Sequence, residues 1–188
     1  MNNRTRSVKR SFRMARDGSA TRRKLLETAE DILLNHPEET ISMRRIAKIC
    51  GISPATIYEH FSGRNELIAA VMIHDWHKCL AKMAEDAENA HSFAEGLVSL
   101  SHEITLFSEK YNAVWNAARS AETMAVMPGR HEQLIEEIQQ YVHQLIERFS
   151  NDQALAIERL LAENVLLCAV RKEISEEELK TLGNYISK

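Results

Sequence analysis

The sequence predicts an all-α protein, and three observations support that fold class. Apolar residues recur at spacings of three and four along most of the chain, which is the period of an amphipathic helix. No stretch alternates apolar and polar residues as a half-buried strand does. The 188 residues include only 3 prolines, so few positions forbid the interior of a helix.

Size and composition indicate an ordinary soluble chain divided into two domains. The chain is 44% hydrophobic and 27% charged, which are usual values for globular proteins. Its longest apolar run covers residues 67–73, far fewer than the roughly 20 residues that cross a bilayer. No signal-peptide pattern opens the chain. We therefore expect a cytoplasmic protein.

The net charge of −3 conceals an asymmetry between the two parts of the chain. Residues 1–68 contain 13 Lys and Arg against 8 Asp and Glu, a net charge of +5. Residues 69–188 contain 11 against 19, a net charge of −8. A basic head on an acidic body suits a protein that turns one end toward phosphates.

The first 18 residues form a basic segment with almost no apolar pattern. Six Lys and Arg oppose only Asp17, so we expect no regular structure when the protein is free. Two interpretations remain open. The segment is either an arm that follows the DNA backbone or enters the minor groove, or a solvated tail that keeps the protein soluble.

Residues 21–35 predict a first helix, and a second one follows from Ser42. The first helix has Leu25, Ala29 and Ile32 on one face and ends before His36-Pro37. The second begins with an N-cap at Ser42 and ends at Gly51, since glycine adopts the left-handed conformation that ends many helices. Its apolar stripe is Met43, Ile46 and Ala47, and its outward positions are Arg44, Arg45 and Lys48.

A third helix of about two turns starts immediately after that turn. Ser53 suits the N-cap and Pro54 the first helical position, while Ile57 and Phe61 are expected to anchor the core. Two short helices joined by a tight turn form a helix-turn-helix. A plain structural pair of helices would show the same local pattern, so the neighbouring residues decide between the two interpretations.

The outward positions of the third helix suit a DNA major groove. The small residue Ala55 and the hydroxylated Thr56 would lie closest to the groove floor, because the opening turn of a recognition helix approaches the base edges. Tyr58 and His60 would donate to flanking phosphates. We expect Arg44, Arg45 and Arg64 to contact phosphates as well.

A longer pattern runs from about residue 21 to residue 72. It comprises Leu25, Leu26, Ala29, Ile32, Ser42-Met43, Ile46-Ala47, Gly51-Ile52-Ser53, Thr56-Ile57-Tyr58, Phe61, Arg64, Glu66 and Leu67. This pattern resembles the DNA-binding domain of the TetR (tetracycline-repressor-like) family of bacterial regulators. Departures from the family pattern concern caps and one basic side chain, at Asn35-His36-Pro37, Ala55 and Gly63-Arg64.

The resemblance implies a homodimer that binds a double-stranded DNA operator. The residues expected to bind DNA are Arg44, Arg45, Pro54, Ala55, Thr56, Tyr58, His60 and Arg64. A long helix that begins at Arg64 and continues to about Met83 would be the connector that carries a change in the body to the DNA-binding end. The predicted organisation is a basic arm at 1–18, a DNA-binding domain at 19–66 and a regulatory and dimerisation domain at 67–188.

The body is expected to be helical throughout, with helices at about 92–108, 111–125, 129–149, 152–171 and 176–186. Ser175 and Glu178 form a capping box for the last of these. The helix at 152–171 is apolar on more than one face, which indicates either a subunit interface or a central helix in a monomer core. We assign Leu160, Leu161, Val165 and Cys168 to a dimer interface. In the family, the last two long helices form a dimeric four-helix bundle.

A pocket for a small-molecule effector would be lined by large or adaptable side chains of the body. The candidates are Trp76, Phe93, His102, Phe107, Trp115, Met124 and Tyr141, although such residues more often pack in a core. His74 and His77 lie near Asp75 at a spacing that could hold a metal ion, but a third ligand is missing, so we predict no metal site. The three cysteines, Cys50, Cys79 and Cys168, are predicted to be buried free thiols.

No motif indicates an enzyme or a cofactor site. The 6 glycines are scattered, so no phosphate-binding loop is present, and the sequence has no G-x-S-x-G or H-E-x-x-H motif. Sequence and resemblance together predict a repressor that leaves a palindromic operator when a small molecule binds the body. The alternative is a DNA-bound adaptor of the same fold that docks a protein partner without an inducer.

Overall fold

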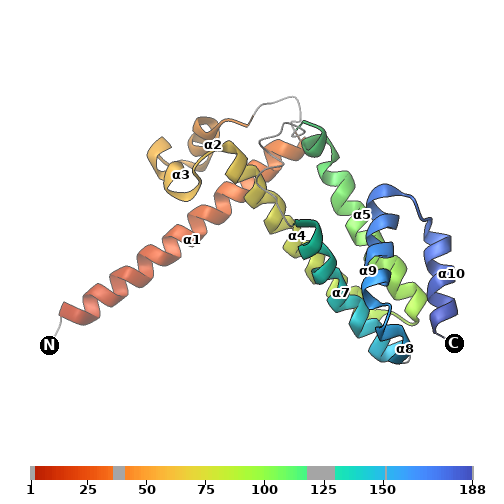
Figure 1. The fold of residues 1–188 in the computed structure, drawn as a ribbon. Coiled ribbons are helices and arrows are strands. Elements are labelled where there is room, and N and C mark those ends of the chain that lie inside the picture. The colour runs from red at the N-terminus through yellow and green to blue at the C-terminus, as the bar shows by residue number, and fades with distance from the viewer. Residues whose placement is uncertain (1–2, 36–40, 118–129, 151, 188) are drawn as a thin grey trace. The chain divides into compact units, whose positions relative to one another are not determined.

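The computed structural model describes residues 3–35, 41–117, 130–150 and 152–187, and all regular structure within them is helical, as predicted (Figure 1). Side chains are described for residues 18–35, 41–112, 132–150 and 154–187. The chain divides into two compact units, Met1–His74 and Asp75–Lys188. This boundary lies later along the connector helix than the predicted one after residue 66. Because residues 69–74 carry no charge, the units keep the net charges of +5 and −8.

The first unit contains α1 (Asn3–Asn35), α2 (Met43–Cys50), α3 (Pro54–His60) and the start of α4 (Arg64–Asn89). The structure differs from the sequence prediction before Thr21, where we expected no regular structure and α1 is continuous from Asn3. The reason lies in local propensity. Arg, Lys, Met and Ala are good helix formers, no proline occurs before residue 37, and the single glycine, Gly18, does not interrupt the helix.

Helix α1 is joined to α2 and to the end of α3 by specific contacts. The Lys24 ammonium donates to the Cys50 carbonyl at 3.0 Å, and the Thr28 hydroxyl lies 3.3 Å from the Cys50 thiol. The Arg22 guanidinium lies over the Phe61 ring, 4.9 Å from its centroid. The buried apolar residues of this unit include Leu25, Leu26, Ala29, Ile32, Ile46, Ala47, Ile57, Phe61, Leu67 and Val71.

The second unit contains the rest of α4, α5 (Phe93–Ala117), α7 (Arg130–Phe149), α8 (Asp152–Leu155), α9 (Glu158–Leu166), the π-helix η1 (Leu167–Arg171) and α10 (Glu176–Ile186). Helix α5 continues through the break that we predicted at residues 109–110, because Glu109 and Lys110 are good helix formers. Residues 118–125 of the predicted helix 111–125 lie outside the described residues. The predicted helix 152–171 is interrupted at Ala156-Ile157.

The core of the second unit is one apolar cluster contributed by every helix named above. Helix α9 packs mainly against α7, and α10 packs against α5 (Figure 1). The predicted capping box of α10 is confirmed, since Ser175 and Glu178 each accept from the other's backbone N–H. All three cysteines are buried free thiols, as predicted. None of the described helices combines the length and apolarity needed to cross a membrane.

The contact between α10 and α5 depends on the absence of a side chain at Gly183. A Cβ atom at this position would lie 2.6 Å from the Ala94 Cα atom and 3.1 Å from the Ala94 nitrogen. Backbone atoms cannot move aside as a flexible side chain can. The two helices therefore approach each other closely only because residue 183 is glycine.

We predict that Gly183→Ala lowers the free energy of unfolding by about 1–3 kcal/mol, because the added methyl group forces α10 away from α5. Gly18→Ala in α1 is the matched control, since a Cβ there meets nothing within 4 Å. It should stabilise the protein by about 0.5–1 kcal/mol through helix propensity. Urea denaturation measures both, and equal stabilities of the two variants would contradict the close packing.

Candidate nucleic-acid interface

The turn between α2 and α3 is built as the sequence predicts. The Ser42 hydroxyl accepts from the Arg45 N–H at 3.4 Å and caps α2. Gly51 ends α2 in the left-handed conformation, with φ 72° and ψ 29°, and its N–H group bonds to carbonyls of the last turn. The Ser53 hydroxyl accepts from the Thr56 N–H at 3.1 Å and caps α3. The helix-turn-helix is thus held by its own capping residues.

Helix α3 is fixed by its inner face. Ile57 has no exposed surface and Phe61, which follows the last turn, is 1% exposed. The Phe61 N–H donates to the Ile57 carbonyl at 3.0 Å and completes the helix end. The prediction that these two residues anchor the helix in the core is confirmed.

The outer face of α3 consists of Pro54, Ala55, Tyr58 and Glu59, all of which are exposed. Ala55 and Glu59 are each two residues from Ile57, which is about 200° around a helix. They therefore lie almost opposite the buried anchor. Tyr58 is 52% exposed and lies to the side of them.

Two of the residues expected on this face lie less far outward. Thr56 is half-buried, and its hydroxyl is 3.0 Å from the Ser53 hydroxyl, within the cap of α3. His60 is also half-buried and lies beside the Phe61 ring. Glu59 is not among the predicted DNA-binding residues, although its spacing of four from Ala55 places it on the same face.

The basic residues that we predict to contact phosphates are exposed. Arg44 and Arg45 on α2 and Arg64 at the start of α4 are all exposed. The Glu66 carboxylate accepts from both the N–H and the hydroxyl of Ser62 at 2.6 Å, and these bonds lower the pKa of Glu66. This carboxylate therefore occupies the Ser62 N–H group just before α4.

Four of the predicted effector-binding residues, Trp76, Phe93, Phe107 and Tyr141, belong to the same packed core of the second unit, where the ring centroids of Trp76 and Phe107 lie 5.2 Å apart. Trp76 and Phe93 lie in the core of the second unit, and the Trp76 indole donates to Glu137 at 2.6 Å. Phe107 and Tyr141 pack against that core, whereas His102 is exposed. The side chains of Trp115 and Met124 lie outside the described residues. These aromatic residues recur at helical spacing chiefly because they pack.

The second unit does have a shallow hollow at its surface, lined by Asp75, Lys78, Cys79, Glu103, Leu106, Phe107 and Lys110. Of the predicted residues with described side chains, only Phe107 contributes to it. Its volume of about 210 Å³ is smaller than the roughly 300–1,000 Å³ of most ligand pockets. Four of its seven lining residues, Asp75, Lys78, Glu103 and Lys110, are charged, and Cys79, Leu106 and Phe107 form the apolar remainder of the wall.

The centre of this hollow is an ion-pair cluster around Asp75. Its carboxylate lies 2.6 Å from the Lys110 ammonium, 3.0 Å from that of Lys78 and 3.1 Å from the Tyr111 hydroxyl. Burial favours a raised pKa for Asp75, but the hydrogen bonds and charges of the two lysines outweigh it and leave the pKa lowered. Nearby, burial raises the pKa of Cys79 to about 12, with smaller contributions from Glu103 and Asp75.

Three of the four residues assigned to a dimer interface lie inside the chain's own core. Leu161, Val165 and Cys168 are buried, whereas Leu160 is 55% exposed. The burial of these three residues within the chain argues against their assignment to a dimer interface. The sequence shows two apolar stripes on this segment, but it does not show which stripe faces inward. The turn at 156–157 and the π-helix at Leu167–Arg171 also change the helical phase.

We predict that Asp75→Asn destabilises the second unit at pH 7, because the partly buried Lys110 and the exposed Lys78 both lose their counter-charge. The pKa of Asp75 is lower in the folded protein than its ordinary value of 3.8, so its contribution to stability is present above that value and lost below it. The stability difference between wild type and variant should shrink between pH 7 and pH 3. Urea denaturation at both pH values measures it, and a constant difference would contradict an ionic contribution.

Comparison with known proteins gives a consistent family. Residues 25–71 match the model of the tetR family of bacterial regulatory proteins. The chain is 31% identical over 133 residues to the HTH-type transcriptional regulator UidR of Escherichia coli, which covers 68% of this chain and 67% of that protein. This identity is high enough, over enough of both chains, to show common family membership.

Solved structures agree on the fold. A TetR-family transcriptional regulator from Rhodococcus sp. superposes with a TM-score of 0.55 at 18% identity, over 90% of this chain and 100% of the other. A transcriptional regulator from Streptomyces coelicolor gives 0.56 at 19% identity, over 89% and 98%. The relatives are DNA-binding regulators and not enzymes, which confirms the prediction that this protein is not an enzyme. The chain belongs to the TetR family of helix-turn-helix transcriptional regulators.

Proposed function

We propose that this regulator is a repressor that acts in the cytoplasm, binds a nearly palindromic operator as a homodimer, and leaves it when a small molecule binds the second unit. The observation that carries the DNA-binding part is the exposed face of α3 in a unit with a net charge of +5. The core-anchored side of the helix fixes this face, and exposed arginines flank it on α2 and α4.

Base contacts and phosphate contacts are assigned to different residues. Pro54 and Ala55 open α3 and leave room for the helix to approach the base edges, and Thr56 follows at the edge of the exposed face. Tyr58, His60, Arg44, Arg45 and Arg64 are proposed to contact the DNA backbone. The basic residues between positions 4 and 16 would add contacts that do not depend on sequence.

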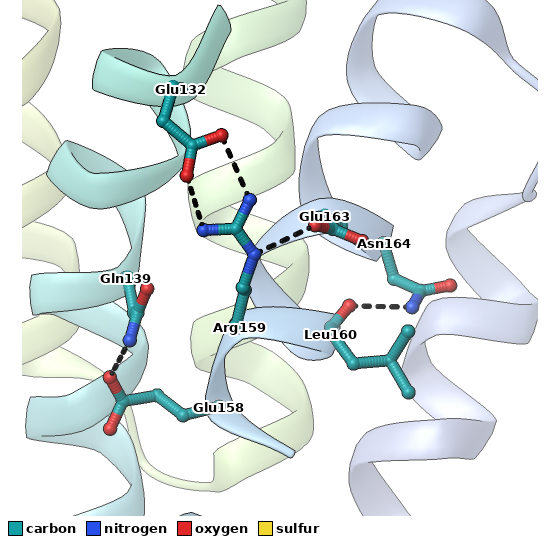
Figure 2. Close-up of polar contacts among 7 residues, drawn as sticks. All are labelled: Glu132, Gln139, Glu158, Arg159, Leu160, Glu163 and Asn164. Atoms are coloured by element: carbon teal, nitrogen blue, oxygen red, sulfur yellow. Dashed lines mark hydrogen bonds and ion pairs between the residues drawn. The ribbon is translucent and has the colours of Figure 1, made fainter.

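Dimerisation is proposed to use the outward apolar residues of α8 to α10. These are Leu155, Leu160, Val170 and Tyr185, of which Tyr185 is 80% exposed. Figure 2 shows the Leu160 side chain directed away from the polar contacts that join α9 to α7, in which Arg159 bonds to both oxygens of Glu132 at 2.6 and 3.0 Å. A second copy would cover these apolar side chains, and its twofold symmetry would match a palindromic operator.

The second candidate function is a DNA-bound adaptor that docks a protein partner on the acidic second unit. The charged, shallow hollow around Asp75 favours it, since a protein surface can match such a wall more readily than a small apolar molecule can. An operator-release assay distinguishes the two candidates when the low-molecular-weight fraction and the protein fraction of a cell extract are tested separately. Release of the operator by that fraction supports an inducer, whereas release only by the protein fraction supports an adaptor.

We predict that Arg64→Ala weakens binding of the full-length protein about equally on every duplex and reduces the salt slope of log K by about 0.9, the effect of one lost phosphate contact. Tyr58→Phe should also weaken binding uniformly, but without a change in slope, because the tyrosine is neutral. Fluorescence anisotropy with duplexes selected from a randomised library measures both.

Lys82→Ala is the matched control for this experiment, because it removes one exposed positive charge from the acidic unit. It should leave operator affinity unchanged. A loss with Lys82→Ala as large as that with Arg64→Ala would contradict the assignment of DNA binding to the first unit.

For the dimer, we predict that Leu160→Glu raises the dissociation constant at least about tenfold, since the charge would be buried against the partner. Sedimentation equilibrium measures this constant, and circular dichroism should show that the variant stays folded. Leu161→Glu is the contrasting change and should unfold the second unit, because residue 161 lies in the core of the chain itself. A Leu160→Glu variant that dimerises as wild type does would exclude this surface as the interface.

A further inference from the structure

Glu59 is the one acidic residue of α3 and is exposed on the outer face of that helix. It lies one turn after Ala55 and almost opposite the buried Ile57. Within the first unit, the other acidic residues with described side chains all have partners: Glu27 pairs with Arg23, Asp31 bonds to Asn35, Glu66 bonds to Ser62 and Glu30 also has an interaction. The Glu59 carboxylate has no hydrogen bond or ion pair to another described residue.

A carboxylate at this position has few compatible neighbours once α3 meets DNA. Both rims of the major groove are lined by phosphates, which repel it. The groove centre contains amino groups of bases, which can donate to it. Glu59 and Ala55 lie on the side of α3 opposite Ile57, and Ala55 is small enough to allow close approach, so in the proposed binding mode Glu59 would face the groove centre rather than a rim.

The donor pattern of the bases selects one partner. An ionised carboxylate only accepts hydrogen bonds. Guanine offers only two acceptors in the major groove, so it cannot donate to a carboxylate. Adenine offers its N6 amino group as a donor, but the adjacent N7 is an acceptor, and a carboxylate has no hydrogen to donate to it. Cytosine offers its N4 amino group alone, and carboxylates are the side chains that accept from it.

We propose that Glu59 is a specificity-determining residue that selects cytosine at one position of each operator half-site by accepting a hydrogen bond from its N4 amino group. This inference rests on the proposed function, in which α3 enters the major groove. It adds an acidic residue to a surface whose other proposed DNA contacts are neutral or basic.

The test uses the full-length protein, a randomised duplex library and then competition among single-base variants of the selected operator at fixed salt. Wild type should prefer cytosine at one position per half-site by about 5- to 150-fold. Glu59→Ala should lose the preference at that position alone. Glu59→Gln should shift it to adenine, because an amide both donates to N7 and accepts from the N6 amino group.

Glu27→Ala is the matched control, since it removes the same charge from an exposed position of the same unit. It should leave every base preference unchanged. If Glu59→Ala and Glu59→Gln keep the cytosine preference, or raise affinity by the same factor on all duplexes, Glu59 only repels phosphates and the inference is overturned. A wild-type protein that enriches no sequence would overturn the proposed function itself, and this inference with it.

Discussion

The burial of Ile57 and Phe61 is the interaction on which the candidate interface depends. A helix of seven residues is too short to persist alone in water, because nucleation costs more than so few hydrogen bonds return. Burying one such side chain contributes about 1.5–3 kcal/mol. With the Ser53 cap at one end and the Arg22 guanidinium over Phe61 at the other, this burial fixes which side of α3 faces outward.

That constraint also explains the division of roles among the exposed residues. Once Ile57 points into the core, the period of the helix places Ala55 and Glu59 on the far side and Tyr58 between the two faces. Thr56 and His60 are then left at the edges, half-buried. The chemistry of the outward face is therefore decided by two positions, one small and one acidic, with basic residues on the neighbouring helices.

Much of this architecture could be predicted from the sequence because local signals determine it. The caps at Ser42, Ser53 and Ser175 and the left-handed Gly51 each act within one turn, and the structure has all four. Long-range packing could not be predicted in the same way. The sequence shows that residues 152–171 are apolar on two sides, but only the packed chain shows that Leu161 and Val165 face inward and Leu160 outward. The ion-pair cluster at Asp75 likewise includes Lys110, which lies 35 positions away in the sequence, so no local pattern could predict it.

The central claim is that the outward face of α3 meets the operator. Hydrogen exchange of the protein, free and bound to its selected operator, tests it most directly, with a scrambled duplex of equal length as the control. We predict slower exchange at residues 42–64 with the operator and a smaller effect with the scrambled duplex. Slower exchange confined to residues 75–187, with α2 and α3 unchanged, would contradict it.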